Sequence, residues 1–190
     1  NGHPRLISIL LGAFIVGVAL GSLLCNRLSR GVIEPGIVPL GAIGLSIFAF
    51  DLSFASIAYQ ETHGSLSAVM PMQFLGLDGG PHILIDLVLI GMFGGFFIVP
   101  LNSMVQQRTA ANNRARVLSV NAIMNAAYMV GGSLLGIFFL SILGWSIMSF
   151  FITVAVMNVL VVGIIFVRIP EFFSRFKLWS SSRFKLLSNR

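Results

Sequence analysis

Long apolar runs separated by short polar segments dominate the sequence. A helix that spans a bilayer needs about 20 consecutive, mainly apolar residues. Runs of this length lack the strict alternation of apolar and polar positions that is typical of a transmembrane β-barrel. They therefore predict an all-α, polytopic membrane helix bundle with about five transmembrane helices, at residues 6–24, 36–58, 83–105, 117–140 and 146–167.

Composition supports a membrane protein and excludes two other classes. The 190 residues are 56% hydrophobic and 9% charged, whereas a soluble domain carries about 25% charged residues. The mean hydropathy is +0.95. A soluble enzyme domain and a disordered chain are both excluded by these values. Because Cys25 is the single cysteine, the chain cannot form an intramolecular disulfide.

The basic residues predict the orientation of the helices. All but one of the 12 Lys and Arg residues lie between the first and second runs, between the third and fourth, or after the fifth; the exception is Arg5. Since positive loops stay in the cytoplasm, this side is expected to be cytoplasmic and the N-terminus of the segment outside. The basic loop residues of interest are Arg27, Arg30, Arg114 and Arg116. No nucleic-acid partner is expected.

The organisation of the chain suggests part of a longer membrane protein. An odd number of helices, an outside start and a first residue other than Met favour a longer chain whose earlier helices precede this segment. The alternative is a complete five-helix protein after processing. We expect a partial transmembrane domain at 1–170, which only a family resemblance assigns to a transporter, and a basic cytoplasmic tail or linker at 171–190. This tail mixes aromatic and basic residues, which suits either contact with an anionic leaflet or a lead into another domain.

Small and polar residues recur on single faces of three runs. Ala13, Gly17 and Gly21 share one face, and so do Gly91, Gly95, Asn102 and Gln106. A third face combines polar and small side chains, at Asn121, Asn125, Tyr128, Gly132 and Gly136. Small residues let membrane helices approach closely, so helix packing is the simplest explanation for the glycines. Carboxamides in hydrocarbon need polar partners, so a polar cavity competes with packing as the explanation for the asparagines.

A hinge is predicted in the third run. Pro100 removes one backbone hydrogen bond and frees the carbonyl of Phe96. Gly94 and Gly95 precede it and add a second flexible point. Membrane helices tolerate such breaks where a neighbour or a cavity satisfies the backbone.

Two acidic residues lie in the apolar runs. Asp86, placed in the first turn of the third run, is explained by the favourable interaction of a carboxylate with a helix N-terminus. Asp51 lies deeper and is a candidate for contact with a substrate or an ion. No Lys or Arg partner for either acid is evident within the membrane runs.

No feature of the sequence argues for catalysis, so the chain is not expected to be an enzyme. It has no Gly-rich phosphate loop, no paired-cysteine motif and no His-Glu zinc signature, and its histidines, at positions 3, 63 and 82, are assigned to outside loops. We expect no cofactor and no metal site.

The stretch 94–108, Gly-Gly-Phe-Phe-Ile-Val-Pro-Leu-Asn-Ser-Met-Val-Gln-Gln-Arg, resembles the tenth helix of lysophospholipid transporters in the major facilitator superfamily. The stretches 114–117 and 121–126 resemble the entry into the eleventh helix of that family. Residues 26–31 resemble its basic loop between helices eight and nine, although Asn26 and Ser29 depart from the motif. The resemblance implies that the five runs are helices eight to twelve, and that about seven helices precede them.

Such a transporter would move lysophospholipid, chiefly of the lysophosphatidylethanolamine type, across the bacterial inner membrane. Its two halves would rock around a site at the middle of the membrane. The expected partners are the bilayer, the lysophospholipid and the earlier helices of the same chain. Two alternatives remain open. One is a proton-coupled exporter of small solutes. The other is the membrane anchor of a lysophospholipid acyltransferase fusion, because residues 170–176 resemble the junction region of such fusions. The candidate substrate-pathway residues are Asp51, Asn102, Gln106, Asn121 and Asn125.

Overall fold

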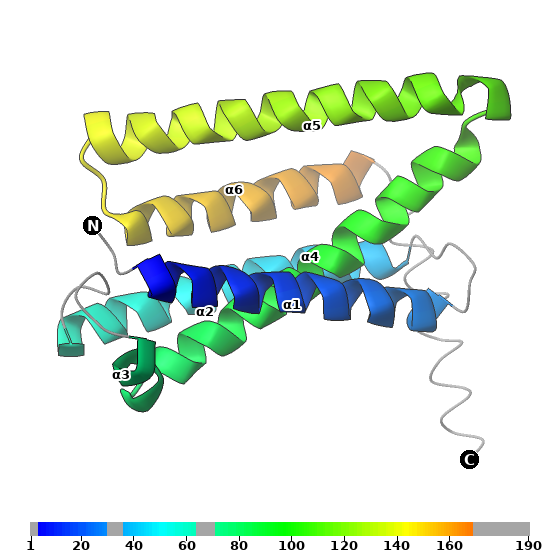
Figure 1. Ribbon diagram of the computed structural model, residues 1–190. Helices are drawn as coiled ribbons and strands as arrows, with labels where there is room; N and C mark the ends of the chain where they lie inside the picture. Colours follow the sequence, from blue (N-terminus) through cyan, green and yellow to red (C-terminus); the bar gives the residue numbers. More distant parts are fainter. Residues whose placement is uncertain (1–3, 30–35, 64–70, 169–190) are drawn as a thin grey trace, which may run out of the picture.

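The computed structural model describes residues 4–29, 36–63 and 71–168, and these residues form a bundle of helices (Figure 1). Within the described residues, five helices are long and apolar enough to cross a membrane, which confirms the predicted all-α membrane fold. These helices are α1 (Pro4–Ser29), α2 (Ile37–His63), α4 (Gly80–Arg108), α5 (Arg114–Ile137) and α6 (Ile147–Arg168).

Three short elements connect the long helices. The helical turn α3 (Pro71–Gly76) precedes α4, a 3-10 turn η2 (Ala111–Asn113) precedes α5, and a π-helical segment η3 (Phe138–Ile142) extends α5. Gly79 has a φ of 92°, which only glycine adopts without strain, and a proline follows in the first turn of α4. These residues make α4 begin at Gly80, before the predicted position 83.

Glycines bring α1 and α4 into backbone contact. A Cβ atom added at Gly17 would collide with the carbonyl group of Val88, and one added at Gly91 would collide with that of Phe14. Gly21 and Gly95 lie one turn further along the same interface, and an added Cβ at Gly95 would lie 2.9 Å from the Ser22 nitrogen. The packing interpretation of these glycines is therefore confirmed. Helix α4 also packs on α2, so that it lies between α1 and α2 (Figure 1).

Helix α6 packs against α2 through a polar contact. The Asn158 side chain donates a hydrogen bond from Nδ2 to the Ser46 Oγ atom, 2.9 Å away. The Ser46 hydroxyl in turn donates to the Ala42 carbonyl, one turn earlier in α2, at 3.0 Å. Hydrogen bonds between membrane helices stabilise the bundle by about 0.6 kcal/mol on average and up to about 1.7 kcal/mol.

Replacing Asn158 by leucine is expected to lower the free energy of unfolding by about 1 kcal/mol, because the hydrogen bond between α6 and α2 is lost. Unfolding of the purified protein in detergent, followed by circular dichroism, measures the change. Met157→Leu is the matched control, since Met157 is 56% exposed and adjacent in the same helix. Equal stabilities of the two variants would contradict a stabilising role for this contact.

Helix α5 has little support from the other long helices. None of its residues, all of which are described, is buried, and its main contacts are with the short segments η2 and η3 at its ends. No described atom lies within 4 Å of a Cβ added at Gly132, and the nearest atom to one at Gly136 belongs to Phe150 of α6, at 3.9 Å. Figure 1 shows α5 at the edge of the bundle. One long side of this apolar helix is therefore open to lipid or to further helices.

Candidate functional site

A cleft of about 860 Å³ lies between the C-terminal half of α4 and the N-terminal half of α5. Asn102 of α4 lines it from one side, and Asn121 and Asn125 of α5 line it from the other. The cleft lies near the end of the bundle where arginines gather, which we call the basic end and define by Arg27, Arg108, Arg114, Arg116 and Arg168.

The connection between α4 and α5 brings these asparagines together. Helix α4 continues past the buried Pro100 and ends where Thr109 adopts an extended backbone with φ −96° and ψ 127°. The Thr109 hydroxyl donates to the Val105 carbonyl at 2.6 Å, and the Asn113 N–H donates to the Ala110 carbonyl at 2.9 Å. This tight turn returns the chain as α5, so that its first turns lie opposite the last turns of α4 (Figure 1).

The lining of the cleft is amphipathic. Carboxamide groups donate and accept hydrogen bonds, and a guanidinium donates to phosphate or carboxylate in a bidentate manner. Arg108 and Tyr128 add a cation and a phenol to the three asparagines, and the remaining walls are mainly apolar, from Phe97, Ile98, Leu101, Met104, Val105 and Met129. Ligand sites in proteins usually occupy about 300–1,000 Å³ and combine apolar walls with a few polar groups. Such a lining suits a solute with a polar head and an apolar chain.

The structure distributes the sequence-predicted pathway residues over three places. Asn102, Asn121 and Asn125 meet in the cleft, whereas Gln106 is exposed on α4 and is not among the lining residues. Asp51 lies on α2 and does not line the cleft either. Sequence reasoning missed Arg108 as a lining residue. The available signal is the spacing, since Asn102, Val105 and Arg108 follow one another at intervals of three residues along one side of α4.

The predicted hinge residues lie in different surroundings. Gly95 is fixed by its close contact with α1, whereas a Cβ at Gly94 would meet only the Leu45 side chain, at 3.9 Å. Pro100 is buried within an uninterrupted α4. The hinge itself stays a prediction. Arg27, Arg114 and Arg116 are exposed at the basic end, while Arg30 and the predicted tail 171–190 lie outside the described residues.

A second cavity of about 750 Å³ lies toward the opposite end of the bundle. Four long helices contribute to its walls, which are mainly apolar. Phe14 of α1, Leu52 of α2, Leu87 of α4 and Phe151 of α6 are among the lining residues. This groove offers a mainly hydrophobic surface, in which Gln60 is the single carboxamide among the lining residues.

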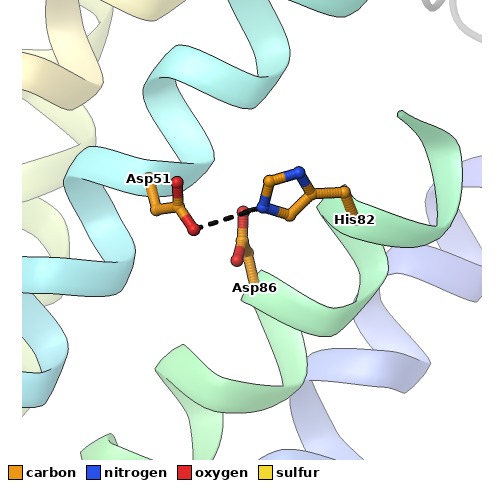
Figure 2. Close-up of side chains that lie close together, drawn as sticks. All are labelled: Asp51, His82 and Asp86. Carbon is orange, nitrogen blue, oxygen red and sulfur yellow. Dashed lines mark hydrogen bonds and ion pairs between the residues drawn. The ribbon is translucent and has the colours of Figure 1, made fainter. Parts of the chain in front are cut away.

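Asp51 belongs to a cluster with His82 and Asp86 (Figure 2). The His82 Nε2 atom lies 3.2 Å from Asp51 Oδ2 and 3.7 Å from Asp86 Oδ2. Two expectations from the sequence are corrected here. Asp86 is not in the first turn, because α4 begins at Gly80, and His82 belongs to this helix rather than to a loop.

The cluster joins two helices. His82 and Asp86 are four residues apart and so share one face of α4, and Asp51 reaches them from α2 (Figure 2). The four-residue spacing of His82 and Asp86 was the available sequence signal, and it was overlooked because the start of α4 was placed too late. The partner of Asp51 is thus a histidine of this chain rather than a Lys or Arg.

No family model, curated protein or solved structure matches the chain. The geometry of the cleft and of the cluster therefore carries the functional argument.

Proposed function

We propose that this chain is the C-terminal half of a major facilitator transporter that moves lysophospholipid across the bacterial inner membrane. The observation that carries the proposal is the cleft between α4 and α5, where Asn102, Asn121 and Asn125 face apolar walls. The three carboxamides and Arg108 would hold the zwitterionic headgroup through hydrogen bonds and an ion pair. The apolar walls would accept the single acyl chain.

The exposure of α5 fits this proposal. Its apolar surface and its polar face would be covered by the other half of the transporter, supplied by earlier helices of the same chain. In such transporters the substrate lies between two halves that rock against each other, so α5 would line the site at the interface between the halves. With the basic end in the cytoplasm, the cleft would open toward the cytoplasmic side.

Removal of the two α5 carboxamides tests the proposal. In the full-length transporter, Asn121→Ala together with Asn125→Ala is expected to lower the initial rate of lysophosphatidylethanolamine uptake by about tenfold, because each lost hydrogen bond contributes about 0.5–1.5 kcal/mol. Uptake into cells or proteoliposomes with a labelled lipid measures the rate. Gln107→Ala is the matched control, since Gln107 is a carboxamide on α4 that does not line the cleft.

The other functions give different results in the same assay. Unchanged uptake in the double variant, at equal membrane levels, would refute the role of the asparagines. Uptake or export of small solutes that needs a proton gradient and shows no lipid preference would identify an exporter instead. Full acyltransferase activity of the intact chain without lipid flux would identify a membrane anchor.

A further inference from the structure

The most unusual group within the apolar helices is the carboxylate of Asp86. Its residue is 1% exposed, and its Oδ2 atom has no hydrogen-bond partner among the described residues. Burial of a charge in apolar surroundings is costly unless a counter-charge or a metal compensates it. Figure 2 shows His82 and Asp51 beside this carboxylate. The buried oxygen therefore points to a ligand.

The distances within the cluster suit a metal ion. The ligand atoms of Asp51, His82 and Asp86 all lie within 4.8 Å of one another. Around a tetrahedral Zn²⁺ with bonds of about 2.1 Å, neighbouring ligand atoms are separated by about 3.4 Å. The two distances from His82 Nε2, 3.2 Å to Asp51 and 3.7 Å to Asp86, lie on either side of this value. A metal ion bound by all three side chains would bring each pair of ligand atoms close to this separation.

The ligand types select the class of metal. Mg²⁺ and Ca²⁺ prefer sites made entirely of oxygen atoms, whereas an imidazole suits Zn²⁺ and the related first-row transition metals. The side chains of His82 and Asp51 are 54% and 47% exposed, so a metal held here keeps a coordination position open to water. Three protein ligands with one position left for water are typical of open zinc sites, whereas structural zinc sites have four protein ligands.

We propose that Asp51, His82 and Asp86 form a binding site for a divalent transition-metal ion of the Zn²⁺ type, which links α2 to α4. None of the three residues lines the cleft between α4 and α5. The metal site is thus independent of the proposed transport of lysophospholipid. Binding ties the middle of α2 to the beginning of α4 and neutralises the buried carboxylate.

Calorimetric titration of the metal-free, full-length protein with Zn²⁺ tests the site. We expect one Zn²⁺ per chain and an affinity at least tenfold above that for Mg²⁺, the oxygen-preferring control. His82→Ala, Asp86→Asn and Asp51→Asn are each expected to weaken Zn²⁺ binding by about tenfold or more, since even partners outside the ligand shell change metal affinity by about 10–100-fold. Asp78→Asn is the matched control, because Asp78 is an exposed acid in the turn before α4.

Thermal unfolding provides a second measurement of Zn²⁺ binding, and this measurement does not depend on transport. Zn²⁺ should raise the melting temperature of the wild type and of Asp78→Asn, and should leave that of His82→Ala unchanged. If Asp86→Asn does not fold, the half-exposed Asp51 and His82 still allow the test. Zn²⁺ binding that equals Mg²⁺ binding, or that survives in both Asp51→Asn and His82→Ala, would overturn the proposal. Loss of pH-dependent transport in these variants without any Zn²⁺ binding by the wild type would also overturn it and would assign the cluster to protons.

Discussion

Replacement of Gly91 by alanine is expected to destabilise the bundle by about 3 kcal/mol, at the upper end of the usual cost of overpacking. The new methyl group would collide with the Phe14 carbonyl oxygen and would lie 2.9 Å from the Val18 nitrogen. Both atoms belong to the backbone of α1, so they cannot rotate away as a side chain would. Helices α1 and α4 must separate, and contacts along the whole interface weaken.

Gly94 provides the matched control for this prediction. It lies in the same helix, and the only described atom near a Cβ added there belongs to the Leu45 side chain, at 3.9 Å. Because alanine favours a helix over glycine by about 1 kcal/mol, Gly94→Ala should leave stability unchanged or raise it. Unfolding of both variants in mixed detergent micelles, followed by circular dichroism, gives the comparison. If the two variants unfold alike, the close contact between α1 and α4 is wrong.

Replacement of Phe74 by alanine is expected to cost about 3–5 kcal/mol, the usual range for a buried phenylalanine. Phe74 is 0% exposed, and its ring centroid lies 5.4 Å from that of Tyr59 at the end of α2. It also shares a buried cluster with Leu6, Leu52 and Ile83. Removal of the ring leaves a cavity where α1, α2, α3 and α4 meet, so the turn α3 should detach.

Met72→Ala is the control for Phe74, because Met72 lies on the same short helix and is 83% exposed. The free energy of unfolding should fall in Phe74→Ala and hardly change in Met72→Ala. Limited proteolysis of the segment 71–79 should become faster in Phe74→Ala alone. Equal rates for the two variants would show that the ring does not hold α3 in place.

The sequence allowed a good prediction of the membrane helices, and a poorer one of where α4 begins and of which helices contact each other. Runs of about 20 apolar residues place the spans directly, since only helices and closed β-barrels satisfy the backbone in lipid and the runs lack the alternation of barrel strands. The start of α4 was missed because Gly80 and Pro81 read as a turn, whereas Pro81 lies in the first turn of the helix. Proline is well tolerated at that position, but the glycine before it masks the helix signal.

Helical periodicity shows which residues share a face, but not which helix covers it. It grouped Gly91, Gly95 and Asn102 together, yet the two glycines pack on α1 while the asparagine lines the cleft with α5. One face of α4 therefore has two neighbours: it packs on α1 near Gly91 and Gly95 and faces α5 near Asn102. The meeting of Asp51 with His82 depends on the register between α2 and α4, which no pattern within either helix contains.

The glycine contacts between α1 and α4 also determine which parts of the molecule can move. At Gly17 and Gly91 the surfaces in contact are main chains, an arrangement that allows helices to approach closely. Backbone atoms in contact at these positions cannot rotate away as side chains can, so α1 and α4 should resist sliding and move together. Helix α5, with no buried residue, has no comparable restraint. In the proposed transporter, a change in the width of the cleft should therefore come from displacement of α5 rather than from sliding between α1 and α4.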